Sequence, residues 1–135
     1  MHETSLVSAL MQQVEAAAME LRASAVHRIR VRIGELAGVE PQLFASAFEL
    51  FRERTICAAA RLEIVTAAAA WTCPGCGAAI APGQVLRCPD CALPARLASG
   101  DEIILERIEM EVPAARDRGR NVPPRRERTM EATDV

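Results

Sequence analysis

Two pairs of cysteines constrain this chain more than any other feature of its sequence. Cys73 and Cys76 form one Cys-x-x-Cys unit, and Cys88 and Cys91 form a second unit that begins 12 positions after Cys76. A two-residue spacer lets both sulfurs of a pair reach one ion, and two such pairs close the tetrahedral Cys₄ geometry that zinc takes in structural sites. We therefore expect these four thiolates to hold a structural Zn²⁺ ion.

The same cysteine pairs are also compatible with an iron site, and their number and turn residues bear on the kind of metal site that forms. A rubredoxin-like iron site uses similar cysteine units and would transfer electrons, an alternative that a colourless purified protein would exclude. A closed Cys₄ site leaves no open coordination position, so we do not expect a catalytic zinc. The residue after each second cysteine often needs a positive φ, which suits Gly77 and costs Ala92 about 1 kcal/mol.

The remaining sequence alternates between helix and strand periodicity. Apolar residues recur at helical spacing over 6–21 and again over 41–54, while 27–33 alternates strictly between apolar and arginine side chains. Residues 61–65 and 103–110 are rich in β-branched residues and predict two further strands. We expect an α+β fold with a small three-stranded sheet, two helices and an inserted Cys₄ zinc-ribbon module.

These patterns suggest boundaries within the chain. We expect one α/β domain from residues 1–68 and 101–112, and a zinc-binding domain from 69–100 inserted between two strands of its sheet. The segment 113–135 is rich in Arg and Pro and poor in apolar residues, so we expect it to be disordered. All three phenylalanines lie on the second helix, which predicts that this helix is central to the core. His27 shares the strand parity of Ile29 and Val31, which favours a core position over a ligand role.

Composition excludes several classes of protein. The net charge of −2 argues against a protein that binds nucleic acid through phosphate contacts. Neither a secretory signal nor an apolar stretch of roughly 20 residues is visible, so we expect no membrane span. Paired Cys-x-x-Cys units favour metal binding in a reducing cytoplasm over disulfides. With two histidines and no recognisable nucleophile–base pair, an enzyme is not expected.

The N-terminus, Met1-His2-Glu3, carries a second chemical possibility. A histidine at position two is compatible with an ordinary frayed terminus. However, its imidazole and the neighbouring main-chain nitrogens can chelate a metal through five- and six-membered rings. Amide nitrogens bind only when deprotonated, and the resulting nitrogen-rich square-planar geometry favours Ni(II) or Cu(II) over zinc.

Several short segments together resemble the HypA/HybF family of hydrogenase nickel-incorporation proteins. The matching segments are Met1-His2-Glu3 with Ser5-Leu6, residues 33–41 (Ile-Gly-Glu-Leu-Ala-Gly-Val-Glu-Pro), Ala47-Phe48-Glu49, both Cys-Pro-x-Cys units and residues 99–102 (Ser-Gly-Asp-Glu). They cover residues 1–112 in order, and Ala92 departs from the glycine that is common in such knuckles.

This resemblance implies a nickel metallochaperone for [NiFe]-hydrogenase. By position it makes His2 a nickel ligand through its imidazole and main chain, Glu3 a ligand through its backbone nitrogen, and Met1 a contributor through its place at the terminus. It also assigns zinc to the four cysteines. The implied partners are a HypB-type GTPase and the hydrogenase large subunit, and some family members also serve urease. The alternative from another class is a zinc-ribbon module that binds protein or nucleic acid.

Overall fold

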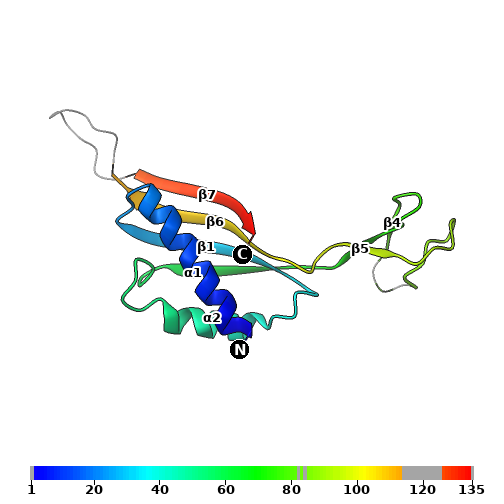
Figure 1. Ribbon diagram of the computed structural model, residues 1–135, viewed down its shortest axis with the longest axis horizontal. Helices are drawn as coiled ribbons and strands as arrows, with labels where there is room; N and C mark the ends of the chain where they lie inside the picture. Colours follow the sequence, from blue (N-terminus) through cyan, green and yellow to red (C-terminus); the bar gives the residue numbers. More distant parts are fainter. Residues whose placement is uncertain (1, 82, 84, 114–125, 135) are drawn as a thin grey trace.

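The computed structural model describes residues 2–81, 83, 85–113 and 126–134, without the side chains of His2 and of 126–134 (Figure 1). Its elements, in order, are α1 (His2–Glu20), β1 (Ala25–Gly34), α2 (Pro41–Phe51), β2 (Arg61–Ala67), β3 (Ala70–Thr72), β4 (Ala79–Ile80), β5 (Arg96–Ser99), β6 (Ile103–Val112) and β7 (Arg126–Asp134). We call α1, α2 and the sheet of β1, β2, β6 and β7 the α/β domain. Residues 69–100, with the small sheet of β3, β4 and β5, are called the cysteine module.

The sheet of the α/β domain has the strand order β2-β1-β6-β7. β1 and β2 are parallel and are joined through α2, whereas β6 is antiparallel to β1. Consequently β1 and β2 finish, and β6 begins, at one end of the sheet, where Gly34 pairs with Ala67 and Ile33 with Ile103. The cysteine module leaves from this end and extends beyond it (Figure 1). The predicted insertion of a cysteine module between two strands of one sheet is therefore correct.

The predicted three strands are present, but the sheet has a fourth. Residues 126–134 were expected to be disordered, and they instead form β7, which pairs antiparallel with β6 from Val112↔Arg126 to Ile104↔Asp134. An edge strand is held by main-chain hydrogen bonds, which polar sequences supply as well as apolar ones, so low apolar content did not exclude it. Residues 114–125, also part of the predicted tail, lie outside the described residues.

The core of the α/β domain lies between the two helices and one face of the sheet. α2 contributes Phe44 and Phe48, which are fully buried, whereas Phe51 remains 38% exposed at the end of the helix. From α1 come Val7, Leu10 and Val14, which are also fully buried. The prediction that α2 is central to the core therefore holds for two of its three phenylalanines. It misses Phe51 because α2 ends there.

The opposite face of the sheet carries the alternating arginines, as predicted. Arg30 and Arg32 both approach the carboxylate of Glu106, at 3.2 and 3.1 Å, and Arg28 approaches Glu109 at 3.9 Å. Glu106 reaches both partners because the pairing of β1 with β6 shifts register between Arg30 and Val31, which leaves Glu106 as an extra residue on β6. This basic face is thus matched by acidic groups of the neighbouring strand.

The predicted core position of His27 is wrong. The register of β1 against β6 also shifts between Val26 and Arg28, so His27 is the extra residue of a bulge. Val26 points into the core in its place, and His27 lies at the surface with its Nε2 3.3 Å from a Glu111 carboxylate oxygen. A bulge inverts the side-chain alternation on which the prediction relied.

Candidate metal centres

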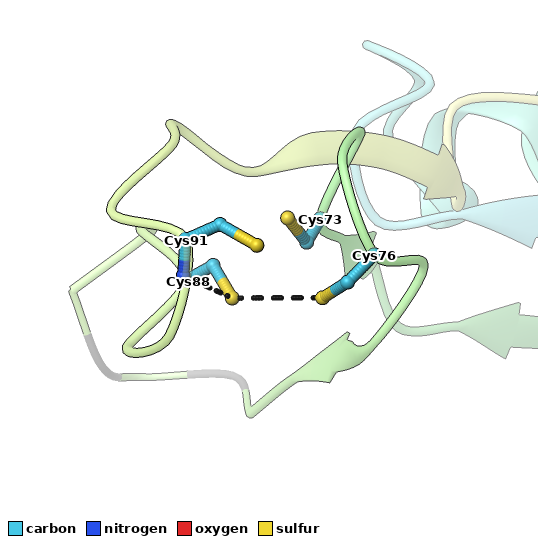
Figure 2. A group of neighbouring side chains, drawn as sticks. All are labelled: Cys73, Cys76, Cys88 and Cys91. Atoms are coloured by element: carbon cyan, nitrogen blue, oxygen red, sulfur yellow. Dashed lines mark hydrogen bonds between the residues drawn. The ribbon is translucent and has the colours of Figure 1, made fainter.

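The four cysteines converge on one point between two loops of the cysteine module. Cys73 and Cys76 come from the turn between β3 and β4, and Cys88 and Cys91 from the loop that precedes β5 (Figure 2). Their four sulfur atoms all lie within 4.8 Å of one another. Cys73 and Cys88 are buried, whereas Cys76 and Cys91 are exposed. The structure therefore brings together all four residues that the spacing predicted.

Both loops have the same main-chain hydrogen bonds. In the first, the Cys73 amide donates to the Ala78 carbonyl and the Gly77 amide donates to the Cys73 carbonyl, both at 2.9 Å. In the second, the Cys88 amide donates to the Leu93 carbonyl and the Ala92 amide donates to the Cys88 carbonyl, again both at 2.9 Å. This shared pattern makes each Cys-x-x-Cys unit a closed turn whose two sulfurs face the same side.

Main-chain amides also point at the sulfurs. The Gly75 amide donates to Cys73 Sγ at 3.3 Å, and the Cys91 amide donates to Cys88 Sγ at 3.4 Å. Such bonds favour the charged thiolate, which is the form that binds a metal. In the two buried cysteines, Cys73 and Cys88, the backbone of each turn therefore favours the thiolate form.

The turn residues that follow the cysteine pairs have the conformation expected from the sequence. Gly77 has a φ of 76° and Ala92 a φ of 58°, both in the left-handed region. Glycine adopts this region without steric cost, whereas the Cβ of Ala92 meets the following carbonyl. The second turn therefore carries a small local strain that the first does not.

The spacing of the sulfurs fits a tetrahedral metal. Four ligands at the usual Zn–S distance of about 2.3 Å would lie about 3.8 Å apart. Cys76 Sγ and Cys88 Sγ, which come from different turns, are 3.8 Å apart. The cluster is thus suited to a thiolate-binding metal such as zinc.

Hydrogen bonding distributes the protons of the cluster unequally. The Cys76 amide, assisted by the Gly75 amide, lowers the pKa of Cys73 to about 7 against the opposing effect of burial. The pKa of Cys91 rises to about 12, chiefly because its thiol is hydrogen-bonded to Cys76 and Cys73. The thiolate form is therefore favoured at Cys73 and disfavoured at Cys91, and a bound cation would favour the thiolate form at both.

Cys57, the fifth cysteine, lies apart from the cluster. It is fully buried in the core of the α/β domain, where desolvation raises its pKa to about 11. The Cys57 amide donates a hydrogen bond to the Thr55 hydroxyl oxygen at 3.0 Å. Cys57 is thus a core thiol whose raised pKa keeps it protonated and poorly nucleophilic.

The chain end is described only in part. Met1 lies outside the described residues, and His2 is the first residue of α1, with its side chain outside them. Helix α1 begins four residues earlier than its apolar periodicity predicted. Glu3 is therefore in the first helical turn, and its carboxylate accepts a hydrogen bond from the Glu40 amide at 3.3 Å. This bond places the start of α1 beside the start of α2.

Sequence reasoning missed the residues that support these two regions. Glu35 accepts a hydrogen bond from the Ala69 amide at 2.8 Å, and Glu40 contacts Glu3. Both belong to the segment 33–41, whose sequence indicated only a family resemblance. Their supporting contacts are with residues 34 and 37 positions away in the chain, so no local pattern could reveal them.

Comparisons with known proteins agree with this arrangement. Residues 1–110 match the family described as "Hydrogenase/urease nickel incorporation, metallochaperone, hypA". A hydrogenase maturation factor HypA from Wolinella succinogenes is 40% identical over 114 residues, which are 82% of this chain and 96% of the relative. The HypA of Aquifex aeolicus is 35% identical over 114 residues, which are 83% of this chain and 99% of the relative.

The fold leads to the same group. The solution structure of the Ni metallochaperone HypA from Helicobacter pylori superposes with a TM-score of 0.63 at 33% identity, covering 80% of this chain and 96% of that one. A second solution structure of a HypA protein gives a TM-score of 0.70 at 34% identity, covering 82% of this chain and 96% of that one. On its sequence, its fold and its cysteine cluster, this chain belongs to the HypA family of hydrogenase and urease nickel-incorporation metallochaperones.

Proposed function

We propose that this protein binds Ni(II) at its N-terminus, keeps it from competing ligands and delivers it to [NiFe]-hydrogenase during maturation. The observation that carries the proposal is the family match, which spans both the Met1-His2-Glu3 terminus and the four-cysteine cluster. Nickel is cargo in this role, so the protein acts as a carrier and not as a catalyst.

The first turn of α1 supports nickel binding by main-chain nitrogens. The amides of a helix's first turn do not donate to carbonyls four residues earlier, so metal binding at His2 and Glu3 costs α1 none of those bonds. The His2 imidazole supplies a further nitrogen when it is neutral. Met1 contributes through its place at the terminus. Because the site is at a chain end, incoming ligands can displace these nitrogens one at a time.

Zinc at the cysteine cluster has a structural role in this proposal. Four thiolates complete a tetrahedral shell with no open position for a substrate. The metal also joins two loops that have little apolar packing of their own, as the small buried group of Cys73, Cys88 and Ile80 indicates. Elemental analysis of purified protein tests this identity, because an iron site of the rubredoxin type would be coloured and would contain no zinc.

The family match is also the basis on which we infer the partners and the compartment. We infer that a HypB-type GTPase and the hydrogenase large subunit receive or accompany the nickel, with urease maturation proteins as further candidates. No nucleic acid partner is proposed, because the arginines of β1 are matched by carboxylates of neighbouring strands. Among the described residues, none of the helices is both long and apolar enough to cross a membrane. We infer a cytoplasmic location from the family and from the free cysteines.

The test is nickel stoichiometry in variants of the two histidines. His2→Ala should abolish nickel binding while one zinc per chain remains, because zinc is held by cysteines alone. His27→Ala is a matched control, since His27 is the only other histidine and lies on the exposed part of β1. An N-terminal extension that blocks the amino end should act like His2→Ala. Equal nickel content in His2→Ala and wild type would refute the proposal.

A further inference from the structure

The cysteine module is joined to the α/β domain by two connections that meet the same turn. One connection follows β2 at Ala67, and the other runs from Gly100 to Glu102 before β6. The turn after β1 donates to both of them. The Glu35 amide donates to the Ala67 carbonyl at 2.7 Å, and the Leu36 amide donates to the Gly100 carbonyl at 2.7 Å. The end of β1 therefore bridges the two connections.

The three segments approach each other too closely for side chains. A Cβ at Gly34 would lie 2.2 Å from the Gly100 carbonyl oxygen, and a Cβ at Gly100 would lie 2.5 Å from Ala69 Cα. Gly100 also has a φ of 108°, which side-chain-bearing residues rarely adopt. Main chain thus packs on main chain at this junction, with Ala69 buried beside it.

One side chain completes the junction. The Oε1 atom of Glu35 accepts a hydrogen bond from the Ala69 amide at 2.8 Å. Ala69 is the last residue before β3, the strand that leads directly to Cys73. The bond is partly buried, so the Ala69 amide loses part of its hydrogen-bonding energy when this acceptor is removed, and the bond resists a swing of the module about Ala69.

The same segment also reaches the chain end. Five residues after Glu35, the Glu40 amide donates to the carboxylate of Glu3 in the first turn of α1. The segment 35–40 is thus bonded at one end to the base of the cysteine module and at the other to the terminus. These two hydrogen bonds connect the segment to the module on one side and to α1 on the other.

We propose that Glu35 is a positioning residue that fixes the orientation of the cysteine module on the α/β domain. Through the segment 35–40 it also sets where the cysteine cluster lies relative to the nickel-binding chain end, a consequence that rests on the proposed function. The orientation itself does not depend on nickel. The two ideas can therefore fail separately.

The experiment compares zinc-loaded, full-length wild type with Glu35→Ala and Glu35→Gln. Glutamine retains a carbonyl oxygen as acceptor, whereas alanine removes it. Amide hydrogen exchange reports the bond at Ala69, and ¹⁵N relaxation reports whether module and domain tumble together. Glu53→Ala is the control, because Glu53 is also an exposed carboxylate and lies between α2 and β2, outside the junction.

In Glu35→Ala we expect exchange at Ala69 to accelerate about tenfold, which corresponds to the loss of one hydrogen bond of about 1.4 kcal/mol. The module amides should also show a shorter correlation time than those of the domain, with zinc content unchanged. Glu35→Gln and Glu53→Ala should match wild type. If the alanine variant does not fold, Glu35→Asp, with a carboxylate one methylene shorter, should show the same changes at smaller size.

Two results would overturn the proposal. One is equal Ala69 exchange and equal tumbling in wild type and Glu35→Ala. The other is a Glu35→Gln protein in which Ala69 exchange and module tumbling are as fast as in Glu35→Ala. The carbonyl acceptor would then not be what fixes the module. Nickel stoichiometry is measured alongside and should stay at the wild-type value in all these variants. A loss of nickel only in His2→Ala would keep the test of function separate from the test of orientation.

Discussion

The α/β domain and the cysteine module are stabilised in different ways within one chain. Among the residues whose side chains the structure describes, the domain core contains 19 buried residues, which come from both helices, from β1 and β6, and from the loop between α2 and β2. In the module the buried group consists of Cys73, Cys88 and Ile80, with Trp71 and Ala95 packed against it. Two of those three buried residues belong to the four-cysteine cluster. Apolar burial therefore organises one region, whereas the other has little of it, and we propose that a metal ion organises that region instead.

The largest test of this difference is the removal of one cysteine ligand. Cys88→Ser should unfold the module, because metal binding in small zinc modules is worth about 10–16 kcal/mol and the module has little else. The α/β domain should remain folded on its own core. A ¹H–¹⁵N spectrum measures both, since module amides should lose their dispersion while those of the domain keep it.

Cys57→Ala is the matched control for that substitution. It removes the cysteine that lies in the domain core and outside the cluster, so zinc content and the module spectrum should be unchanged. A Cys88→Ser protein whose module stays folded without metal would contradict the contrast between the two regions.

A smaller effect tests the domain through pH. The pKa of Cys57 is raised from 9.0 to about 11 by burial, so the folded state prefers the neutral thiol. This stability is fully present below pH 9 and is lost as pH rises from 9 toward 11, because the unfolded thiol ionises first. Two pKa units correspond to about 3 kcal/mol. Tyrosine and lysine, which would also titrate between pH 9 and 11, are absent from the chain.

The measurement is the urea midpoint of the zinc-loaded protein at pH 8 and at pH 10.5. The urea midpoint of wild type should fall between these pH values. In Cys57→Ala the fall should be smaller, because the contribution of the Cys57 thiol is missing. Subtracting the two proteins removes the contribution of the other cysteines. Identical pH dependence in both would show that the Cys57 site is more accessible to water than its burial indicates.

The smallest test concerns the strain within the module. Ala92→Gly should stabilise the second cysteine turn by about 1 kcal/mol, because glycine adopts the φ of 58° without cost. In a competition with a chelator, zinc affinity should rise about fivefold. Gly77→Ala is the reverse control and should lower the affinity by a similar factor. Unchanged affinity in both variants would mean that the strain is relieved elsewhere in the turn.

Most of the fold could be predicted from periodicity, and the failures have a common physical origin. Helical spacing and strand alternation report burial on one face, so they identified both helices, β1, β2 and β6. They failed at His27, where a bulge against β6 reverses the alternation. They also failed at β7, which pairs through its main chain with an edge of the sheet.

The candidate sites were predictable to different degrees for a related reason. Cys-x-x-Cys spacing is itself a geometric statement, since the two-residue spacer brings both sulfurs to one ion, and the structure gathers all four cysteines as expected. The support given by Glu35 to Ala69, or by Glu3 to Glu40, has no such local signature. These contacts join residues 34 and 37 positions apart in the chain.

The sequence alone thus determined the cysteine cluster, the two helices and the strands β1, β2 and β6, because each depends on residues a few positions apart. Only the tertiary structure decided how the two connections of the cysteine module meet the turn after β1, and which residues β7 pairs with. Those contacts arise when distant segments share an edge or a junction, and their energies come from main-chain geometry that side-chain patterns do not encode.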